Sequence, residues 1–145
     1  MRTARTFVHV LTPFFILLAF AAAAVAAGPG NGLLGKWKMT TPARDAAGSV
    51  CPFVPEMMEF FSDGTMTLSN MPGNRAPFKT DLTPEERQAI ETRDPALKGK
   101  NLLLVKPVPQ MEWRSTPMVY DYSVARSTLT LSVTGWSPAT FKRMK

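Results

Sequence analysis

A two-residue alternation of apolar and polar side chains is the feature that most constrains the fold of this chain. Apolar residues occupy every second position in 118–124 and in 128–133, and Trp37 and Met39 alternate with lysines. Successive side chains of a strand point to opposite faces, so the pattern predicts strands with one buried face. Such alternation is typical of antiparallel sheets with one solvated face, and it argues against a parallel α/β fold.

Strand-like patterning recurs along most of the chain. The predicted strands lie at residues 34–41, 56–61, 65–70, 101–106, 110–114, 117–125, 128–134 and 139–144. Many short strands separated by turn residues are typical of a closed barrel or a tight sandwich. Closure removes the exposed sheet edges, which suits a chain without an internal disulfide. We therefore predict a mostly β fold: a small antiparallel barrel of seven or eight strands with one surface helix inserted mid-chain.

The Ser-Asp-Gly segment at 62–64 predicts a tight hairpin with two possible registers. A three-residue loop with a left-handed Gly64 pairs Phe60 with Met66 and directs Glu59 outward. A two-residue Asp-Gly turn is the alternative, and it would turn the Glu59 carboxylate inward as a site candidate. A slip of one residue inverts every side chain, so burial of the apolar residues favours the first register.

One helix is predicted within a polar insertion at about 71–100. Thr83 suits the N-cap, a proline follows it, and Glu86 completes a capping box. The helix should run to about Thr92, where an Asp-Pro pair follows. Its apolar face is thin, which is typical of a surface helix. It is either a lid over the barrel mouth or a plain surface excursion.

The first residues have the three-part pattern of an export signal. Arg2 and Arg5 precede an apolar run that extends from about residue 10 to residue 27 and ends in small side chains. An uncleaved membrane anchor is the alternative, but the run after Pro13 is short for a spanning helix. The predicted organisation is a signal peptide at 1–27, a flexible leader at 28–32 and one barrel domain at 33–145. We expect an exported protein, periplasmic or extracellular, that meets the membrane only through this transient signal.

Residue usage excludes several function classes. The only histidine, His9, lies in the expected signal, so the mature chain lacks the commonest general base and metal ligand. Cys51 is the only cysteine, and we expect it to be a small buried residue, with an intermolecular disulfide as the alternative. The net charge of +6 includes Arg2 and Arg5 of the expected signal, and the basic residues of the mature chain are interleaved with acidic ones, unlike a nucleic-acid-binding surface. No enzyme activity, cofactor, metal or nucleic-acid partner is predicted.

Three short motifs carry a resemblance to a known family. They are LLGKWK at 33–38, EFFSDGT at 59–65 and FKR at 141–143. Together they resemble the small lipocalin-like domain proteins that bacteria export. The resemblance implies that Gly35 and Trp37 pack at the closed end of the barrel, with Arg143 from the last strand over the indole. Guanidinium over indole is a favourable cation–π pair.

The predicted inner face of the barrel carries aromatic and methionine side chains. The candidate ligand-binding residues are Met39, Met58, Phe60, Met66, Met111, Trp113, Tyr120 and Tyr122. Methionine adapts to variable shapes, and a buried tyrosine hydroxyl needs a polar partner that a ligand can supply. An eight-stranded barrel is wide enough only to be filled by side chains or to hold one small ligand. A filled core and a ligand cavity are therefore both open.

Two functions follow from these observations. The first is a non-enzymatic exported barrel that binds a small apolar or amphipathic molecule, as the interior and the lipocalin-like ends imply. The alternative is a structural or protein-interaction module of the cell envelope with a filled core. The volume and lining of the barrel interior would discriminate between them.

Overall fold

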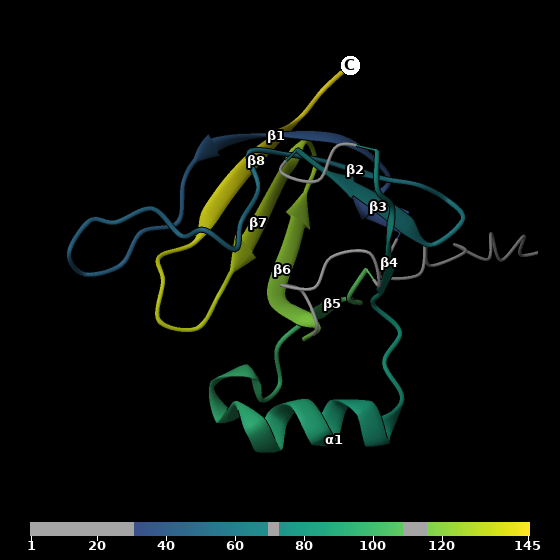
Figure 1. Ribbon diagram of the computed structural model, residues 1–145, viewed down its shortest axis with the longest axis vertical. Helices are drawn as coiled ribbons and strands as arrows, with labels where there is room; N and C mark the ends of the chain where they lie inside the picture. Colours follow the sequence, from purple (N-terminus) through teal and green to yellow (C-terminus); the bar gives the residue numbers. More distant parts are fainter. Residues whose placement is uncertain (1–30, 70–72, 109–115) are drawn as a thin grey trace, which may run out of the picture.

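The computed structural model describes residues 31–69, 73–108 and 116–145. The strands pair antiparallel in chain order and the last pairs with the first, so the sheet closes into a barrel (Figure 1). The elements are η1 (Asn31–Leu33), β1 (Gly35–Thr41), β2 (Met57–Phe60), β3 (Thr65–Leu68), β4 (Ala76–Lys79), α1 (Pro84–Arg93), η2 (Pro95–Leu97), β5 (Leu102–Val105), β6 (Met118–Ala125), β7 (Thr128–Ser132) and β8 (Ala139–Arg143). The predicted fold, a mostly β antiparallel barrel with one helix, is confirmed. In these described ranges no helix is long and apolar enough to cross a membrane.

Some predictions concern residues that the structure does not describe. They are the signal peptide at 1–27, the first residues of the leader at 28–32 and the strand at 110–114 with Met111 and Trp113. The last residues of the leader form the short helix η1, whose Leu33 is 0% exposed and belongs to the core. This helix directly precedes β1 in the chain.

The hairpin of β2 and β3 adopts the three-residue loop. Phe60 pairs with Met66 and Glu59 with Thr67. Gly64 has a φ of 80°, a left-handed conformation that glycine adopts without steric penalty. The alternative register, with Glu59 on the inner face, does not occur, because the favoured register buries the side chains of both Phe60 and Met66.

Strand β4 corrects the prediction that the stretch 71–100 interrupts the barrel. Ala76–Lys79 pairs with β3 on one side and with β5 on the other. The sequence pattern did not indicate this strand, because Pro77 is unusual inside a sheet and Ala76 is the only fully buried side chain of β4. The part of the stretch after β4, with α1 and η2, leaves the barrel wall (Figure 1).

Side chains on the inner face form one hydrophobic core. Trp37, Leu129 and Phe141 are 0% exposed. The loop between β1 and β2 adds Ala43 and Cys51, joined by a hydrogen bond of 2.9 Å from the Cys51 N–H to the Ala43 carbonyl. Cys51 is 2% exposed, so its thiol is buried within the core.

Helix α1 begins and ends close to the predicted positions. Thr83 is the N-cap, and its side chain and that of Glu86 form both bonds of a capping box. The helix ends at Arg93, before the Asp-Pro pair that starts η2. Figure 1 shows α1 outside the barrel, next to the strands β5 and β6 and far from β1.

Candidate functional site

The barrel interior is packed with side chains. Five of the predicted ligand-binding residues are at most 6% exposed and belong to one core cluster: Met58, Phe60, Met66, Tyr120 and Tyr122. Met39 is half-buried and packs against this cluster. The barrel therefore brings these predicted residues together, and the described ones pack against one another as core.

Both interior tyrosine hydroxyls have protein partners. Tyr120 donates a hydrogen bond of 2.7 Å to the Phe53 carbonyl in the loop between β1 and β2. Burial raises the pKa of Tyr122, and a hydrogen bond with Thr80 opposes that shift. Buried hydroxyls need such partners. Their hydrogen-bonding capacity is thus met, at least in part, without a ligand in the barrel.

Arg143 lies over the Trp37 indole, as expected. Its guanidinium carbon lies 4.3 Å from the centre of the Trp37 ring. It also donates hydrogen bonds to the carbonyl oxygens of Leu34 and, at 2.6 Å, of Gly32. The Trp37 indole N–H donates to the Leu33 carbonyl at 2.7 Å. These contacts join the first strand to the last, so this cluster has a structural role.

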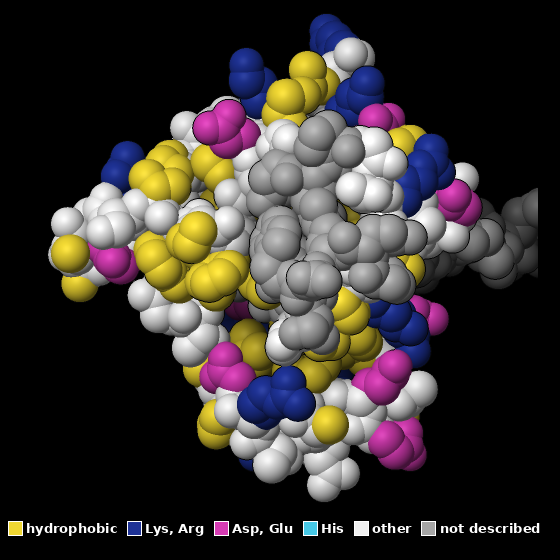
Figure 2. Space-filling view, in the orientation of Figure 1, with side chains coloured by type: hydrophobic (Ala, Val, Ile, Leu, Met, Phe, Trp, Pro, Cys, Tyr) yellow, Lys and Arg dark blue, Asp and Glu magenta, His cyan; other side chains and the backbone are white. Residues whose placement is uncertain are grey.

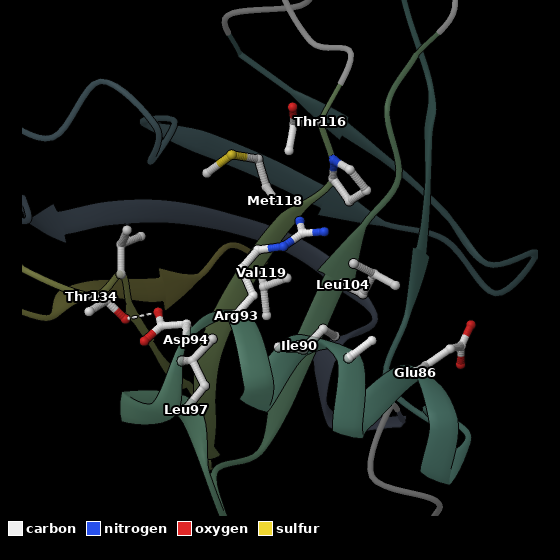
Figure 3. Close-up of a pocket in the computed structure, with 13 residues that line it drawn as sticks. Glu86, Ile90, Arg93, Asp94, Leu97, Leu104, Thr116, Met118, Val119 and Thr134 are labelled. Carbon is white, nitrogen blue, oxygen red and sulfur yellow. Dashed lines mark hydrogen bonds between the residues drawn. The ribbon is translucent and has the colours of Figure 1, made fainter.

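A separate apolar groove lies between α1 and the outer surface of the barrel, with a volume of about 490 Å³ (Figure 3). We call it the α1 groove. Its apolar lining comprises Ala89, Ile90, Leu97, Leu104, Pro117, Met118, Val119 and Val133. Its polar lining comprises Glu86, Arg93, Asp94, Thr116 and Thr134.

The floor of the α1 groove follows from the strand register. Leu103 is paired with Tyr120, and both are buried in the core, so their neighbours face outward. Those neighbours, Leu104 and Val119, are paired with each other on the outer face. Figure 3 shows Ile90 rising from α1 towards them. The groove is therefore bounded by a helix on one side and by an apolar outer sheet face on the other.

Polar contacts at both ends hold α1 over this face. Near the N-terminus, the Lys79 ammonium on β4 lies 2.6 Å from the Glu86 carboxylate. At the C-terminus, Thr134 donates a hydrogen bond of 2.6 Å to the Asp94 carboxylate, which also caps η2 (Figure 3). No residue of α1 is itself fully buried. The helix thus spans the groove and is held by polar contacts near both of its ends.

The two acidic groups of the groove are held by partners of their own. The hydrogen bond from Lys79, with a second from the Thr83 N–H, keeps the pKa of Glu86 below its ordinary value of 4.5. The same contact raises the pKa of Lys79. Asp94 accepts hydrogen bonds from the Thr134 hydroxyl and the Ala96 N–H. Both carboxylates therefore face these partners.

Arg93 differs from those acids. It is exposed, and among the described residues no hydrogen bond or ion pair is formed by its side chain. In Figure 3 its guanidinium extends past Val119 towards Met118, away from Asp94. The groove therefore combines an apolar floor with one cation that has no described partner.

The part of the chain that the structure describes holds no group of three or more His, Cys, Asp or Glu side chains able to bind a metal ion. The α1 groove contains the carboxylates of Glu86 and Asp94, each engaged as above, and no thiol. What its geometry can do chemically is to bury apolar surface and to offer one positive charge.

The α1 groove was not among the sites predicted from the sequence. A signal was present, because Leu102–Val105 is a continuous apolar run and Met118 and Val119 are adjacent apolar residues. Such runs are typical of strands covered on both faces, whereas a strand with a solvated outer face alternates. The runs mark the place where the outer face is covered by α1 and η2.

Comparison with known proteins identified no relative of this chain. No family model, no curated protein and no solved structure matches this chain. The resemblance to exported lipocalin-like proteins therefore remains a prediction from its three motifs. The structure shows a closed antiparallel barrel of eight strands, with a groove between its outer face and helix α1.

Proposed function

We propose that the protein is an exported, non-enzymatic barrel that binds a small apolar or amphipathic molecule in the α1 groove. The pattern of residues 1–27 supports export. The observation that carries the binding proposal is the apolar space of about 490 Å³ beneath α1. Ligand pockets are commonly about 300–1,000 Å³, mostly apolar, with a few polar groups that orient the ligand.

The way α1 is held supports the same proposal. The helix is fixed by Lys79 at one end and by Thr134 at the other, and its own side chains leave the space beneath it open. Burial of a ligand there would remove apolar surface of the groove from water. This would stabilise the complex by about 25 cal/mol for each Å² of apolar surface buried. The barrel interior, predicted from the sequence, is the alternative location of the ligand.

Methyl NMR during titration with decanol or decanoate tests both locations. The methyl signals of Leu104, Val119 and Val133 should shift, because these side chains line the groove. Those of Leu129 and Leu131, which are 0% exposed in the core, should stay constant. Shifts confined to the core residues would move the site into the barrel. No shift with either compound would contradict the ligand-binding proposal.

A matched pair of substitutions sharpens this test. Ala89→Trp fills the groove from the helix, whereas Ala96→Trp adds the same side chain to an exposed alanine outside its lining. We expect Ala89→Trp to weaken binding by about tenfold or more, equivalent to about 1.4 kcal/mol. Ala96→Trp should leave it unchanged. Equal affinities for the two variants would place the ligand elsewhere.

A second candidate is the protein-interaction module. Val50 and Phe53 are 51% and 46% exposed on the loop between β1 and β2. Figure 2 shows hydrophobic side chains gathered on the side of the molecule where this loop lies. Exposed apolar patches often mark interaction sites. Affinity capture from envelope extract tests this candidate: a partner lost with Phe53→Ser but retained with Met144→Ser, at another exposed apolar position, would favour it.

A further inference from the structure

We propose that the α1 groove selects an amphiphile with a single anionic head group, which pairs with Arg93 while its apolar chain lies beneath α1. This inference rests on the proposed function, since it names the ligand class of the same site. It follows from three features of the groove: the position of Arg93, the engagement of the neighbouring acids and the apolar floor.

Arg93 is placed to receive a head group. It lies in the last turn of α1, and its side chain lines the groove. Figure 3 shows its guanidinium over the floor near Val119 and Met118. A guanidinium forms charge-assisted, often bidentate hydrogen bonds with carboxylate and phosphate groups. Within the described residues, no carboxylate pairs with it.

The two acids of the groove do not oppose an anion at this position. Asp94 is turned towards Thr134 (Figure 3), and Glu86 is paired with Lys79 at the opposite end of α1. The C-terminal helix dipole disfavours an anion only locally, because its effect falls off within the last turn. The guanidinium extends away from the helix towards the barrel (Figure 3), so its own charge dominates where the head group would lie.

The apolar lining of the groove suits the apolar chain of the proposed ligand. Ile90 and Leu97 lie on the helical side, and Leu104, Val119 and Val133 lie on the barrel side. A neutral amphiphile would gain only the burial of its chain against these residues. A cationic amphiphile would bring a like charge to Arg93. An anionic one would combine apolar burial with a charge-assisted hydrogen bond, and so it should bind most tightly.

Calorimetric titration with three amphiphiles of equal chain length tests the inference. The probes are decanoate, decanol and decyltrimethylammonium, and the proteins are the wild type, Arg93→Gln, Arg93→Lys and Arg126→Gln. Arg126 is a matched control, because it is an exposed arginine in the turn at the far end of β6. Thermal unfolding of each variant checks that the fold is retained.

We expect the wild type to bind decanoate about tenfold more tightly than decanol, the size of one charge-assisted hydrogen bond at an exposed site. Decyltrimethylammonium should bind most weakly. Arg93→Gln should reduce the affinity for decanoate to that for decanol. Arg93→Lys should retain part of the preference, and Arg126→Gln all of it.

The outcomes separate this inference from the proposed function. If decanoate and decanol bind with equal affinity, or if Arg93→Gln and Arg126→Gln behave alike, the anionic specificity is wrong while ligand binding stands. If none of the three probes binds, the proposed function fails and the specificity fails with it. A preference for the cationic probe would overturn the role given to Arg93.

Discussion

At Gly35, the absence of a side chain makes room for the Arg143 side chain, which packs on Trp37. Its φ is +110°, and a β-carbon at this position would lie 3.2 Å from the Nη1 atom of Arg143. That guanidinium in turn covers the Trp37 ring at 4.3 Å. The glycine of the Gly-x-Trp motif is therefore favoured by the backbone conformation, and a larger residue would also press on the Arg143 side chain.

Gly35→Ala should lower the free energy of unfolding by about 2 kcal/mol, because it combines an unfavourable φ with a close contact. Gly48→Ala is the matched control, since Gly48 also has a positive φ, +86°, but a β-carbon added there would have no neighbour within 4 Å. Urea unfolding measures both. A loss at Gly35 no larger than that at Gly48 would show that Arg143 moves aside without penalty.

At the level of secondary structure elements, the attachment of α1 depends on the pair of Lys79 and Glu86. The hydrogen bond from Lys79 lowers the pKa of Glu86 in the folded protein. A carboxylate with a lowered pKa stabilises the fold above its unfolded pKa, and this contribution is lost as the pH falls through the folded value. The N-terminal end of α1 should therefore be held less firmly against the barrel at acidic pH.

Hydrogen exchange can follow this loosening. As the pH falls from about 7 to below 4.5, the ordinary pKa of a glutamate, the amides of α1 should lose protection relative to those of β7. Glu86→Gln should show the lower protection already at neutral pH. Glu85→Gln, at the exposed neighbouring position, should behave like the wild type. Equal protection of α1 in all three proteins at both pH values would show that the pair does not hold the helix.

Elements with strong local signals could be predicted from the sequence. Thr83 and Glu86 defined the start of α1 through a capping box, which depends only on neighbouring residues. The register of β2 and β3 followed from Gly64 and from the need to bury Phe60 with Met66. Strand patterning and turn residues were sufficient to predict every strand of the closed barrel except β4.

Features that depend on tertiary packing could not be predicted in the same way. Strand β4 is short and contains Pro77, so only its neighbours β3 and β5 make it a strand. The groove likewise depends on where α1 lies, and no periodic pattern within a helix as polar as this one specifies its position. Arg93 became a candidate only when the fold placed it over Val119.

At the scale of the whole molecule, apolar side chains lie on both faces of the strands β5 and β6, and those on the two faces belong to different regions. The inner one is a continuous core that includes Leu103, Tyr120 and Leu131. The outer one is the α1 groove, which begins one residue away at Leu104 and Val119. Stability should therefore reside mainly in the first region and binding in the second.

Two leucine-to-alanine substitutions test this separation. Leu131→Ala removes a side chain that is 0% exposed and should lower the free energy of unfolding by about 2–5 kcal/mol, while the affinity for decanoate stays unchanged in the folded protein. Leu104→Ala, in the half-buried floor of the groove, should lower stability by only about 1 kcal/mol and weaken decanoate binding about five- to tenfold. Urea unfolding and calorimetry provide the two quantities. If instead Leu131→Ala weakens binding and Leu104→Ala does not, the ligand occupies the barrel, and α1 serves only to cover the outer face.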